Sequence, residues 1–484
     1  MKTLKFFSLG LLFLSLFNSC SNWGNGELIG VQNREPWYEP DPYGMIYVPM
    51  GSYNMGPNDQ DVSWAMTAEA KTVSIHPFWM DQTEITNNEY RQFVYWVRDS
   101  IAKVKLAENG LDQHKIEEDA YGNTIDPYFL NWDESIYWKG EDERDILDEM
   151  YLPEHERFYR RKEIDTRKLM FTYYWIDLKQ AAKKYDFEGK KRRSYDYDNQ
   201  KYNETHNGEN YVTNWSVEKN PDGIRVDRSN VGKKVPVESR KTYIMMDVIN
   251  VYPDTLCWMS DFTYSYNDPA TKMYFWHPAY DHYPVVGVSW KQATAFSVWR
   301  TQLLNGTLSK WGEQFVQDYR LPTESEWEYA ARGGLRESMY PWGGYYTRNM
   351  TGCFVANFKP LRGNYMADGG FYPVIVGIND PNAYGLYDMA GNVAEWTSNA
   401  FDEAAYSYTD DLNPDYQYDA RPTDPPALKR KVIRGGSWKD IAYYLQCGSR
   451  TYEYQDTAKS YIGFRCVRTF LGRERNDSGG SQVY

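Results

Sequence analysis

The stretch that most constrains this chain spans residues 382–398 and reads Asn-Ala-Tyr-Gly-Leu-Tyr-Asp-Met-Ala-Gly-Asn-Val-Ala-Glu-Trp-Thr-Ser. Its aromatic side chains are interspersed with glycines, which permit tight backbone turns. Two carboxylates, Asp388 and Glu395, flank a turn at Gly391 and Asn392. Carboxylate and carbonyl oxygens on a kinked segment suit a hard cation such as Ca²⁺, which takes about 6–8 oxygen ligands. The alternative is a polar loop whose carboxylates accept hydrogen bonds from backbone amides.

Three capping boxes predict where helices begin. In each, a Ser or Thr is followed three residues later by Glu or Gln, so that the two side chains satisfy backbone amides at the helix start. The boxes lie at residues 86–89, 289–292 and 323–326. The first precedes four apolar side chains at helical spacing, Tyr90, Phe93, Val94 and Val97.

Short strands are predicted between these helices. Apolar or alternating runs favour strands at 46–50, 73–75, 212–215 and 242–251, and charged residues between 141 and 168 favour helix. Short elements separated by long loops predict an irregular α+β domain.

The composition excludes one broad class of partner. The chain has 484 residues, of which 42% are hydrophobic and 25% charged, as is typical of a globular protein. Its formal net charge of −13 argues against nucleic acid as the main partner. Aromatic residues make up 17% of the chain, with 44 Tyr, and such side chains suit protein interfaces.

The N-terminus predicts export and lipidation. A basic start is followed by an apolar run over residues 6–17 that is too short to span a bilayer, so we interpret residues 1–19 as a signal peptide. Cys20 then resembles a lipoprotein processing site, with residues 20–42 as a tether. No acidic cluster follows Cys20, which favours an outer-membrane anchor facing the periplasm. The alternative is ordinary secretion with an incidental Cys20.

The remaining cysteines offer little catalytic chemistry. Cys257, Cys353, Cys447 and Cys466 allow three disulfide pairings in an oxidising compartment, and we predict Cys447 with Cys466. The sequence has no Cys-x-x-Cys, no nucleophile elbow, no phosphate-binding loop and no His pair at metal-ligand spacing.

Six blocks, taken in order, resemble the formylglycine-generating-enzyme (sulfatase-modifying factor) family. They are residues 51–56, 81–87, 284–290, 320–328, 382–398 and 434–438, with Gly-Phe-Arg at 463–465 as a further match. The resemblance implies an irregular, C-type-lectin-related α+β fold with little regular secondary structure. It places the family domain at residues 43–99 and 283–471, a large insertion at 100–282 and a flexible tail at 472–484.

The resemblance also implies what chemistry is missing. Active members oxidise a substrate cysteine using copper held by two cysteines just after the Gly-Gly-Ser turn, and the matching positions here are Asp440 and Leu445. Leucine cannot ligate copper, so we expect no copper and no enzyme activity. A protein-modifying cysteine oxidase that uses Cys447 and Cys466 stays open as an alternative.

Structural calcium sites are a further implication of the resemblance. One maps onto Asp388, Gly391, Val393 and Glu395, and the other onto Asn357 and Asp368. We expect Ca²⁺ to stabilise the loops without taking part in catalysis.

The anchor and the insertion suggest a scaffold. Together they resemble the ring lipoproteins of the gliding-motility and type IX protein secretion machinery, which implies self-association into a large ring with a periplasmic partner of the GldN/PorN type. The basic run Lys190, Lys191, Arg192 and Arg193 is our candidate partner-binding segment, although such a run can also be a solvated face. A peptidoglycan- or carbohydrate-binding lipoprotein is the remaining alternative.

Overall fold

The structure is a computed structural model that describes part of the chain. The described residues are 39–57, 70–119, 121–182, 195–196, 201–202, 211–220, 224–237, 239–265, 268–361, 364, 366 and 369–472. The predicted signal peptide, Cys20, Asp368 and the basic run from Lys190 to Arg193 lie outside these ranges. Residues from Asp41 to Phe470 form one compact unit.

Three capped helices begin where their capping boxes predict. They are α2 (Asn87–Glu108), α7 (Trp290–Trp311) and α8 (Glu324–Arg332). In each, the N-cap hydroxyl accepts from the N3 amide and the N3 side chain accepts from the N-cap amide. Helices α7 and α8 end at Gly312 and Gly333, whose positive φ values of 70° and 57° suit glycine.

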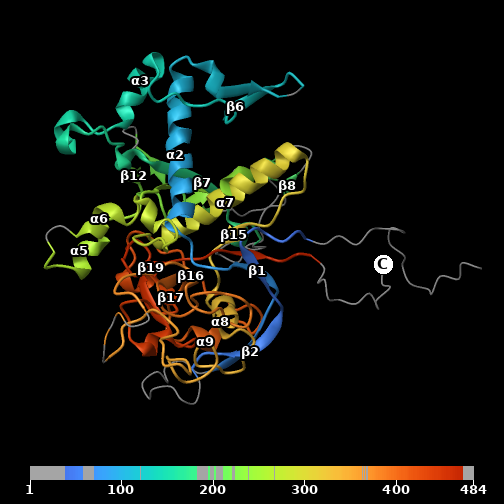
Figure 1. Cartoon of the computed structure of the whole chain (residues 1–484). Helices are drawn as coiled ribbons and strands as arrows, with labels where there is room; N and C mark the ends of the chain where they lie inside the picture. The colour runs from blue at the N-terminus through green and yellow to red at the C-terminus, as the bar shows by residue number, and fades with distance from the viewer. Residues whose placement is uncertain are drawn as a thin grey trace, which may run out of the picture. The chain divides into compact units, whose positions relative to one another are not determined.

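Two four-stranded sheets hold the unit together (Figure 1). The first has the order β1 (Met45–Val48), β4 (Phe78–Asp81), β20 (Val467–Thr469) and β15 (Tyr319–Arg320). The second has the order β18 (Thr451–Tyr454), β17 (Arg430–Arg434), β16 (Ala394–Ala400) and β19 (Ile462–Gly463). Because β20 pairs antiparallel with β4, the last strand of the unit lies beside one of the first.

The remaining strands form two-stranded sheets. These are β2 (Gly51–Met55) with β3 (Lys71–Ile75), β5 (Lys115–Glu118) with β6 (Thr124–Leu130), β7 (Met170–Ile176) with β14 (Ile244–Asn250), β8 (Tyr195–Asp196) with β9 (Lys201–Tyr202), β10 (Tyr211–Thr213) with β13 (Lys234–Pro236), and β11 (Glu218–Lys219) with β12 (Val226–Asp227). The short helices are α3 (Glu141–Leu147), α4 (Leu178–Ala182), α5 (Cys257–Asp261), α6 (Pro269–Met273) and α9 (Ala405–Tyr408). The predicted irregular α+β fold is confirmed.

One helix prediction is wrong. The charged stretch 141–168 forms only the seven-residue α3, followed by single 3₁₀ turns such as Asp148–Met150 and Thr166–Lys168. Pro153 interrupts any longer helix, because proline lacks the amide and restricts the residue before it.

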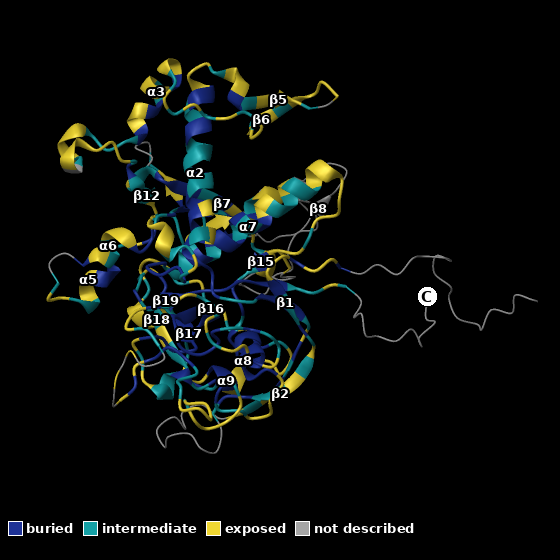
Figure 2. Ribbon diagram, viewed as in Figure 1, coloured by how far each residue is buried: buried dark blue, intermediate teal, exposed yellow. Residues whose placement is uncertain are grey.

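The core is aromatic and includes strands from the predicted insertion. Phe93 of α2 packs edge-on against Phe171 of β7 and Phe296 of α7, with ring centroids 5.2 and 5.8 Å apart. Ile249 of β14 belongs to the same buried cluster. Figure 2 shows the lower half of α2 and its neighbours largely buried. Part of β7 and β14 therefore shares the main core, whereas Met170 of β7 and Val248 of β14 belong to a separate small cluster with Val217.

The described helices do not cross a membrane. Among the residues that the structure places, no helix combines the length and the apolar character that a bilayer span needs.

Candidate functional site

The site is built on the turn within residues 382–398. Gly391 and Asn392 have φ values of 84° and 57°, a left-handed conformation that glycine adopts freely and asparagine tolerates. The Gly391 amide donates to the Gly435 carbonyl (2.9 Å), and the Asn392 carbonyl accepts from the Trp438 amide (2.8 Å). These bonds hold the turn against the Gly-Gly-Ser-Trp segment.

Three buried carboxylates lie behind this turn, those of Glu84, Asp388 and Glu395. The Arg465 guanidinium donates to both Glu395 oxygens, at 2.6 and 2.7 Å. The Trp327 indole donates to the same carboxylate at 2.8 Å. Glu395 is thus fully engaged by protein donors.

Sequence reasoning missed Glu84, although it lies within the matched block at 81–87. Its carboxylate accepts from the Asn392 side-chain amide (2.7 Å) and the Val393 backbone amide (3.1 Å). Burial raises the pKa of Glu84 well above its usual range, and the charges of Asp388 and Glu395 raise this pKa further. The sequence does carry a signal for Glu84. An acidic side chain here is followed at once by an apolar residue and then by the first residue of a capping box.

The Asp388 carboxylate accepts fewer hydrogen bonds than the Glu395 carboxylate does. Its carboxylate accepts from the Gly377 amide at 2.6 Å, and burial raises its pKa above the ordinary value. The cluster therefore brings three carboxyl groups close to the guanidinium of Arg465, and burial favours the protonated forms of Glu84 and Asp388.

The first predicted calcium site fits this cluster by charge and by donor chemistry. Carboxylate and carbonyl oxygens suit a hard cation, and a bound cation would favour the ionised forms of the nearby carboxyl groups. The side chains are not arranged as a ready metal site, because no group of three or more His, Cys, Asp or Glu with metal-binding spacing occurs among the described residues. The Glu395 oxygens face Arg465, so Asp388 and the carbonyls of Gly391 and Val393 would hold the cation.

The second predicted calcium site is described only at Asn357. The Asn357 side-chain amide donates to the Tyr372 carbonyl (3.0 Å), and its Oδ1 accepts from the Gly370 amide (3.1 Å). The Asn357 carbonyl accepts from the Asn392 amide at 2.8 Å. Asn357 thus ties its loop to the central turn through hydrogen bonds, and Asp368 lies outside the described residues.

Asp440 and Leu445, which the sequence resemblance predicts to stand at the family's copper-binding positions, have different surroundings. The Ser437 hydroxyl donates to the Asp440 carboxylate at 2.6 Å, and burial raises the pKa of Asp440. Leu445 is fully buried and packs with Tyr340 and Phe358. Leu445 is therefore a core residue and offers no ligand atom.

A cleft of about 350 Å³ opens beside Trp438. The Phe262 ring lies parallel to Trp438, with centroids 6.2 Å apart, and Phe371 extends the aromatic wall. Asp261, at the end of α5, pairs with Lys439 and accepts a hydrogen bond from Ser460. Residues from the predicted insertion thus form one wall of the cleft. The remaining lining residues are Phe358, Lys359 and Gly370.

The predicted disulfide between Cys447 and Cys466 is wrong. Both are free thiols, and they lie in different buried clusters, Cys447 with Trp327 and Cys466 with Phe464. Burial raises the pKa of each thiol to about 12, so neither forms the reactive thiolate at neutral pH. The Cys466 sulfur lies 3.4 Å from the Ser297 hydroxyl.

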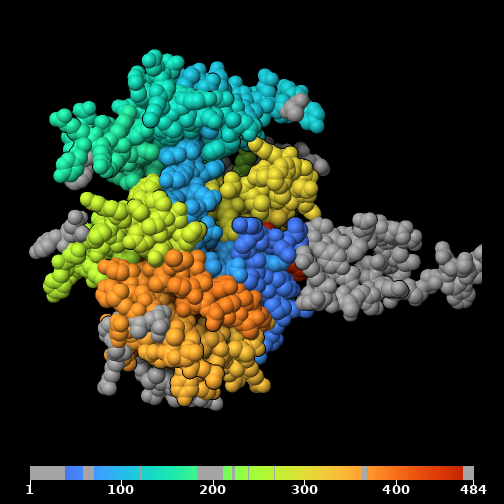
Figure 3. All heavy atoms as spheres, in the orientation of Figure 1, coloured from blue at the N-terminus to red at the C-terminus, as the bar shows by residue number. Residues whose placement is uncertain are grey.

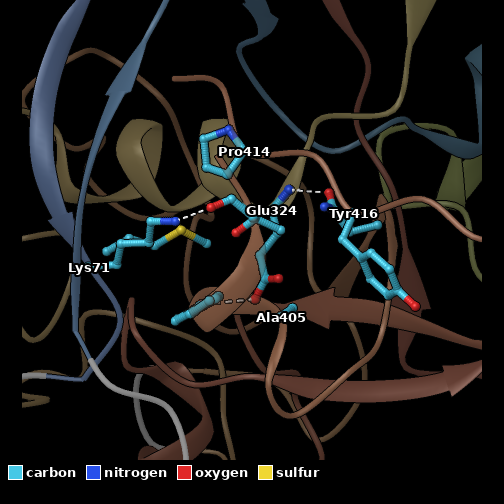
Figure 4. Close-up of a pocket in the computed structure, with 9 residues that line it drawn as sticks. Lys71, Glu324, Ala405, Pro414 and Tyr416 are labelled. Atoms are coloured by element: carbon cyan, nitrogen blue, oxygen red, sulfur yellow. Dashed lines mark hydrogen bonds between the residues drawn. The ribbon is translucent and has the colours of Figure 1, made fainter. Parts of the chain in front are cut away.

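A second cavity, which Figure 4 shows with its lining residues, includes Ala405 of α9 and is too small for a ligand. Lys71 donates to the carbonyl of Thr409, and Glu324 accepts from the Tyr406 hydroxyl at 3.1 Å. The space that remains is about 10 Å³, roughly that of one water molecule. Glu324 also pairs with Arg450, which makes this network part of the core.

Comparison with known proteins identifies relatives of both catalytic and inactive kinds. The family described as Sulfatase-modifying factor enzyme 1-like domain matches residues 34–139 and 267–470. The chain is 33% identical over 201 residues to the inactive C-alpha-formylglycine-generating enzyme 2 of Mus musculus, covering 40% of this chain and 51% of that protein. It is also 33% identical over 201 residues to the formylglycine-generating enzyme of Bos taurus, covering 40% and 45%.

The matched regions are limited. The chain spans about half the length of these curated relatives. Among solved structures, PvdO from Pseudomonas aeruginosa aligns with a TM-score of 0.40 and 15% identity, covering 90% of this chain and 100% of that one. The unmatched stretch, residues 140–266, lies within the predicted insertion at 100–282.

Proposed function

Because this chain belongs to the sulfatase-modifying factor enzyme 1-like domain family, we propose that it is a non-catalytic member that serves as a scaffold. The observation that carries the proposal is that Leu445 is a fully buried apolar side chain. The resemblance predicts that active members place a copper-binding thiol at this position. Cys447 and Cys466 do not replace that pair, since they are buried in different clusters.

The scaffold we propose is the ring of the type IX protein secretion and gliding machinery. In this proposal the chain is a lipoprotein of the GldK or PorK type, anchored through lipid on Cys20 in the outer membrane and facing the periplasm. Copies associate into a large ring with a periplasmic partner of the GldN or PorN type. The signal peptide and Cys20 in the sequence support the anchor.

Oxygen uptake tests the non-catalytic part of the proposal. Purified protein loaded with Cu(I) and given a cysteine-containing peptide and a thiol reductant should consume no more oxygen than copper alone. Copper-dependent uptake that Cys447→Ala abolishes would revive the oxidase alternative. The anchor is tested by Cys20→Ser, which should move the protein from the membrane fraction to the soluble periplasmic fraction.

A second candidate, binding of peptidoglycan or another carbohydrate, rests on the cleft beside Trp438. Aromatic rings stack on sugar faces, and Phe371 is 48% exposed in the cleft wall. Co-sedimentation of the purified protein with peptidoglycan, lost in Phe371→Ala and kept in a variant of a distant exposed ring such as Tyr408→Ala, would favour this candidate over the ring.

A structural calcium ion is part of the proposal. It would reduce the repulsion among Glu84, Asp388 and Glu395 and hold together loops that lack regular hydrogen-bond ladders. It would have no role in chemistry.

A further inference from the structure

A compact acidic lobe surrounds the C-terminal half of α2. We define it as residues 109–150; Figure 3 shows this part of the chain, in cyan and teal, gathered at one end of α2. The lobe contains thirteen Asp and Glu but only three Lys and Arg, whereas the net charge of the entire chain is −13. Most of the excess negative charge of the protein is therefore concentrated here.

The lobe is firmly attached to α2. Leu147 and Met150 are buried against Ala102 and Leu106 of the helix. Trp132 stacks on Trp96, with centroids 5.1 Å apart. Two charged contacts add to this packing, from Lys105 to the Glu149 carboxylate (2.7 Å) and from Lys103 to the Glu134 carbonyl (2.5 Å). The lobe thus packs on α2 through apolar, aromatic and charged contacts.

The β5–β6 hairpin gives the lobe an unpartnered sheet face. Among the described residues, no third strand pairs with either of its strands. Ile116 and Phe129 lie opposite each other in register, and they are 40% and 62% exposed. In Figure 2 both strands are drawn mostly as intermediate or exposed. A two-stranded hairpin is only marginally stable in water. Burial of its exposed apolar cross-strand pair against another surface would therefore stabilise it.

Acidic side chains accompany this apolar pair on the lobe. Glu118 and Asp126 are in the hairpin, and Glu141 and Asp142 begin α3. All four are exposed, and no described cation pairs with them. An apolar centre with a charged rim is the usual composition of a protein interface, and the charge selects the partner.

We propose that the exposed face of the β5–β6 hairpin docks a basic surface of a different protein, with Ile116 and Phe129 as its apolar centre. The proposal deepens the scaffold function and rests on it. Charge complementarity decides the occupant: the acidic lobe of a second copy carries the same excess of negative charge and would be repelled from this face, and nucleic acid would be repelled likewise. The partner's Lys and Arg side chains meet the acidic rim.

Carbodiimide cross-linking in the native envelope tests the contact. This reagent joins carboxylates directly to amines, so it reports only lysines in contact with the lobe. We expect peptides containing Glu118, Asp126 or Glu141 linked to lysines of one identified periplasmic protein. Links to another copy of this chain, or no links from the lobe at all, overturn the proposal.

A charge-matched pair of variants gives the quantitative test. The triple variant Glu118→Gln, Glu141→Gln, Asp126→Asn should weaken binding of the purified partner at least tenfold at 0.15 M NaCl. The control triple Glu313→Gln, Glu403→Gln, Asp410→Asn removes the same charge from other exposed sites and should bind as wild type does. The difference between the two triples should shrink at 1 M NaCl, because salt screens exposed charges.

Phe129→Ser tests the apolar centre of the contact separately from its charges. It keeps every charge and should weaken binding at both salt concentrations, with an unchanged melting temperature. Equal binding by the lobe triple and the control triple overturns the proposal. If rings persist with the partner bound at another surface, only the proposed docking site is wrong. If the purified protein is a lone monomer with no partner, the scaffold function itself is wrong.

Discussion

Arg465 and Glu395 form a fully buried bidentate ion pair, with N–O distances of 2.6 and 2.7 Å. The pair joins the C-terminal Gly-Phe-Arg block to the central motif. The Arg465 guanidinium also donates to the Tyr387 carbonyl at 2.9 Å, so it contacts the central motif on both sides of its turn. The same positive charge also opposes the rise in pKa that burial causes for two further carboxyl groups, those of Glu84 and Asp388.

Arg465→Met should therefore be among the most destabilising single changes in the protein. It leaves Glu395 buried without its partner, which costs about 3–5 kcal/mol. Urea unfolding measures the change in the free energy of unfolding. The exposed Arg336→Met should stay within about 0.5 kcal/mol of wild type. A small effect of Arg465→Met would mean that the carboxylates are protonated or compensated by another cation.

Asp388→Asn tests the calcium ion. If the cation binds the folded state, chelation by EDTA lowers the melting temperature of the wild type, since a ligand stabilises by RT ln(1 + [L]/Kd). The same treatment should leave Asp388→Asn unchanged, whereas the exposed Asp133→Asn should respond like wild type. The cation would be ruled out if EDTA left the melting temperature of the wild type unchanged and Asp388→Asn were more stable than the wild type.

The pH dependence of the cation-free protein follows from Glu84. A carboxyl group whose folded-state pKa is raised stabilises the fold while protonated, and this contribution is lost as pH rises through that pKa. The free energy of unfolding of wild type should thus fall relative to that of Glu84→Gln as pH rises above about 4.3, the unfolded-state pKa. Glu154→Gln, at an exposed position, is the control and should follow wild type. Parallel profiles for wild type and Glu84→Gln would contradict the shift.

The cysteines should differ in reactivity under native conditions. Half-buried Cys353 should react with iodoacetamide at pH 8, whereas buried Cys447 and Cys466 should react only after unfolding. Peptide mapping measures each site separately. A Cys447–Cys466 linked peptide from unreduced protein would contradict the free thiols.

Local features of the fold can be predicted from sequence because their causes are local. The capping boxes at Thr86, Ser289 and Thr323 fix helix starts through side chains three residues apart. The family blocks predict the α+β fold as a whole. The helix prediction at 141–168 fails for a reason that is also local, because Pro153 interrupts a helix whatever the pattern of charges around it.

Long-range pairing explains the features that sequence reasoning missed. Glu84 meets Asn392 across 308 residues, and no periodicity connects them. Cys447 and Cys466 are close in sequence but point into different clusters, because β18 and β19 intervene between them. The acidic lobe is visible as composition, but its exposed apolar pair depends on the register of β5 and β6.

The most direct test of the scaffold account is affinity purification of the tagged protein from its native envelope, followed by electron microscopy. The account predicts large rings that contain this chain and one dominant periplasmic partner, and it predicts their loss from the membrane fraction in Cys20→Ser. A lone, membrane-bound monomer with no stoichiometric partner would contradict it.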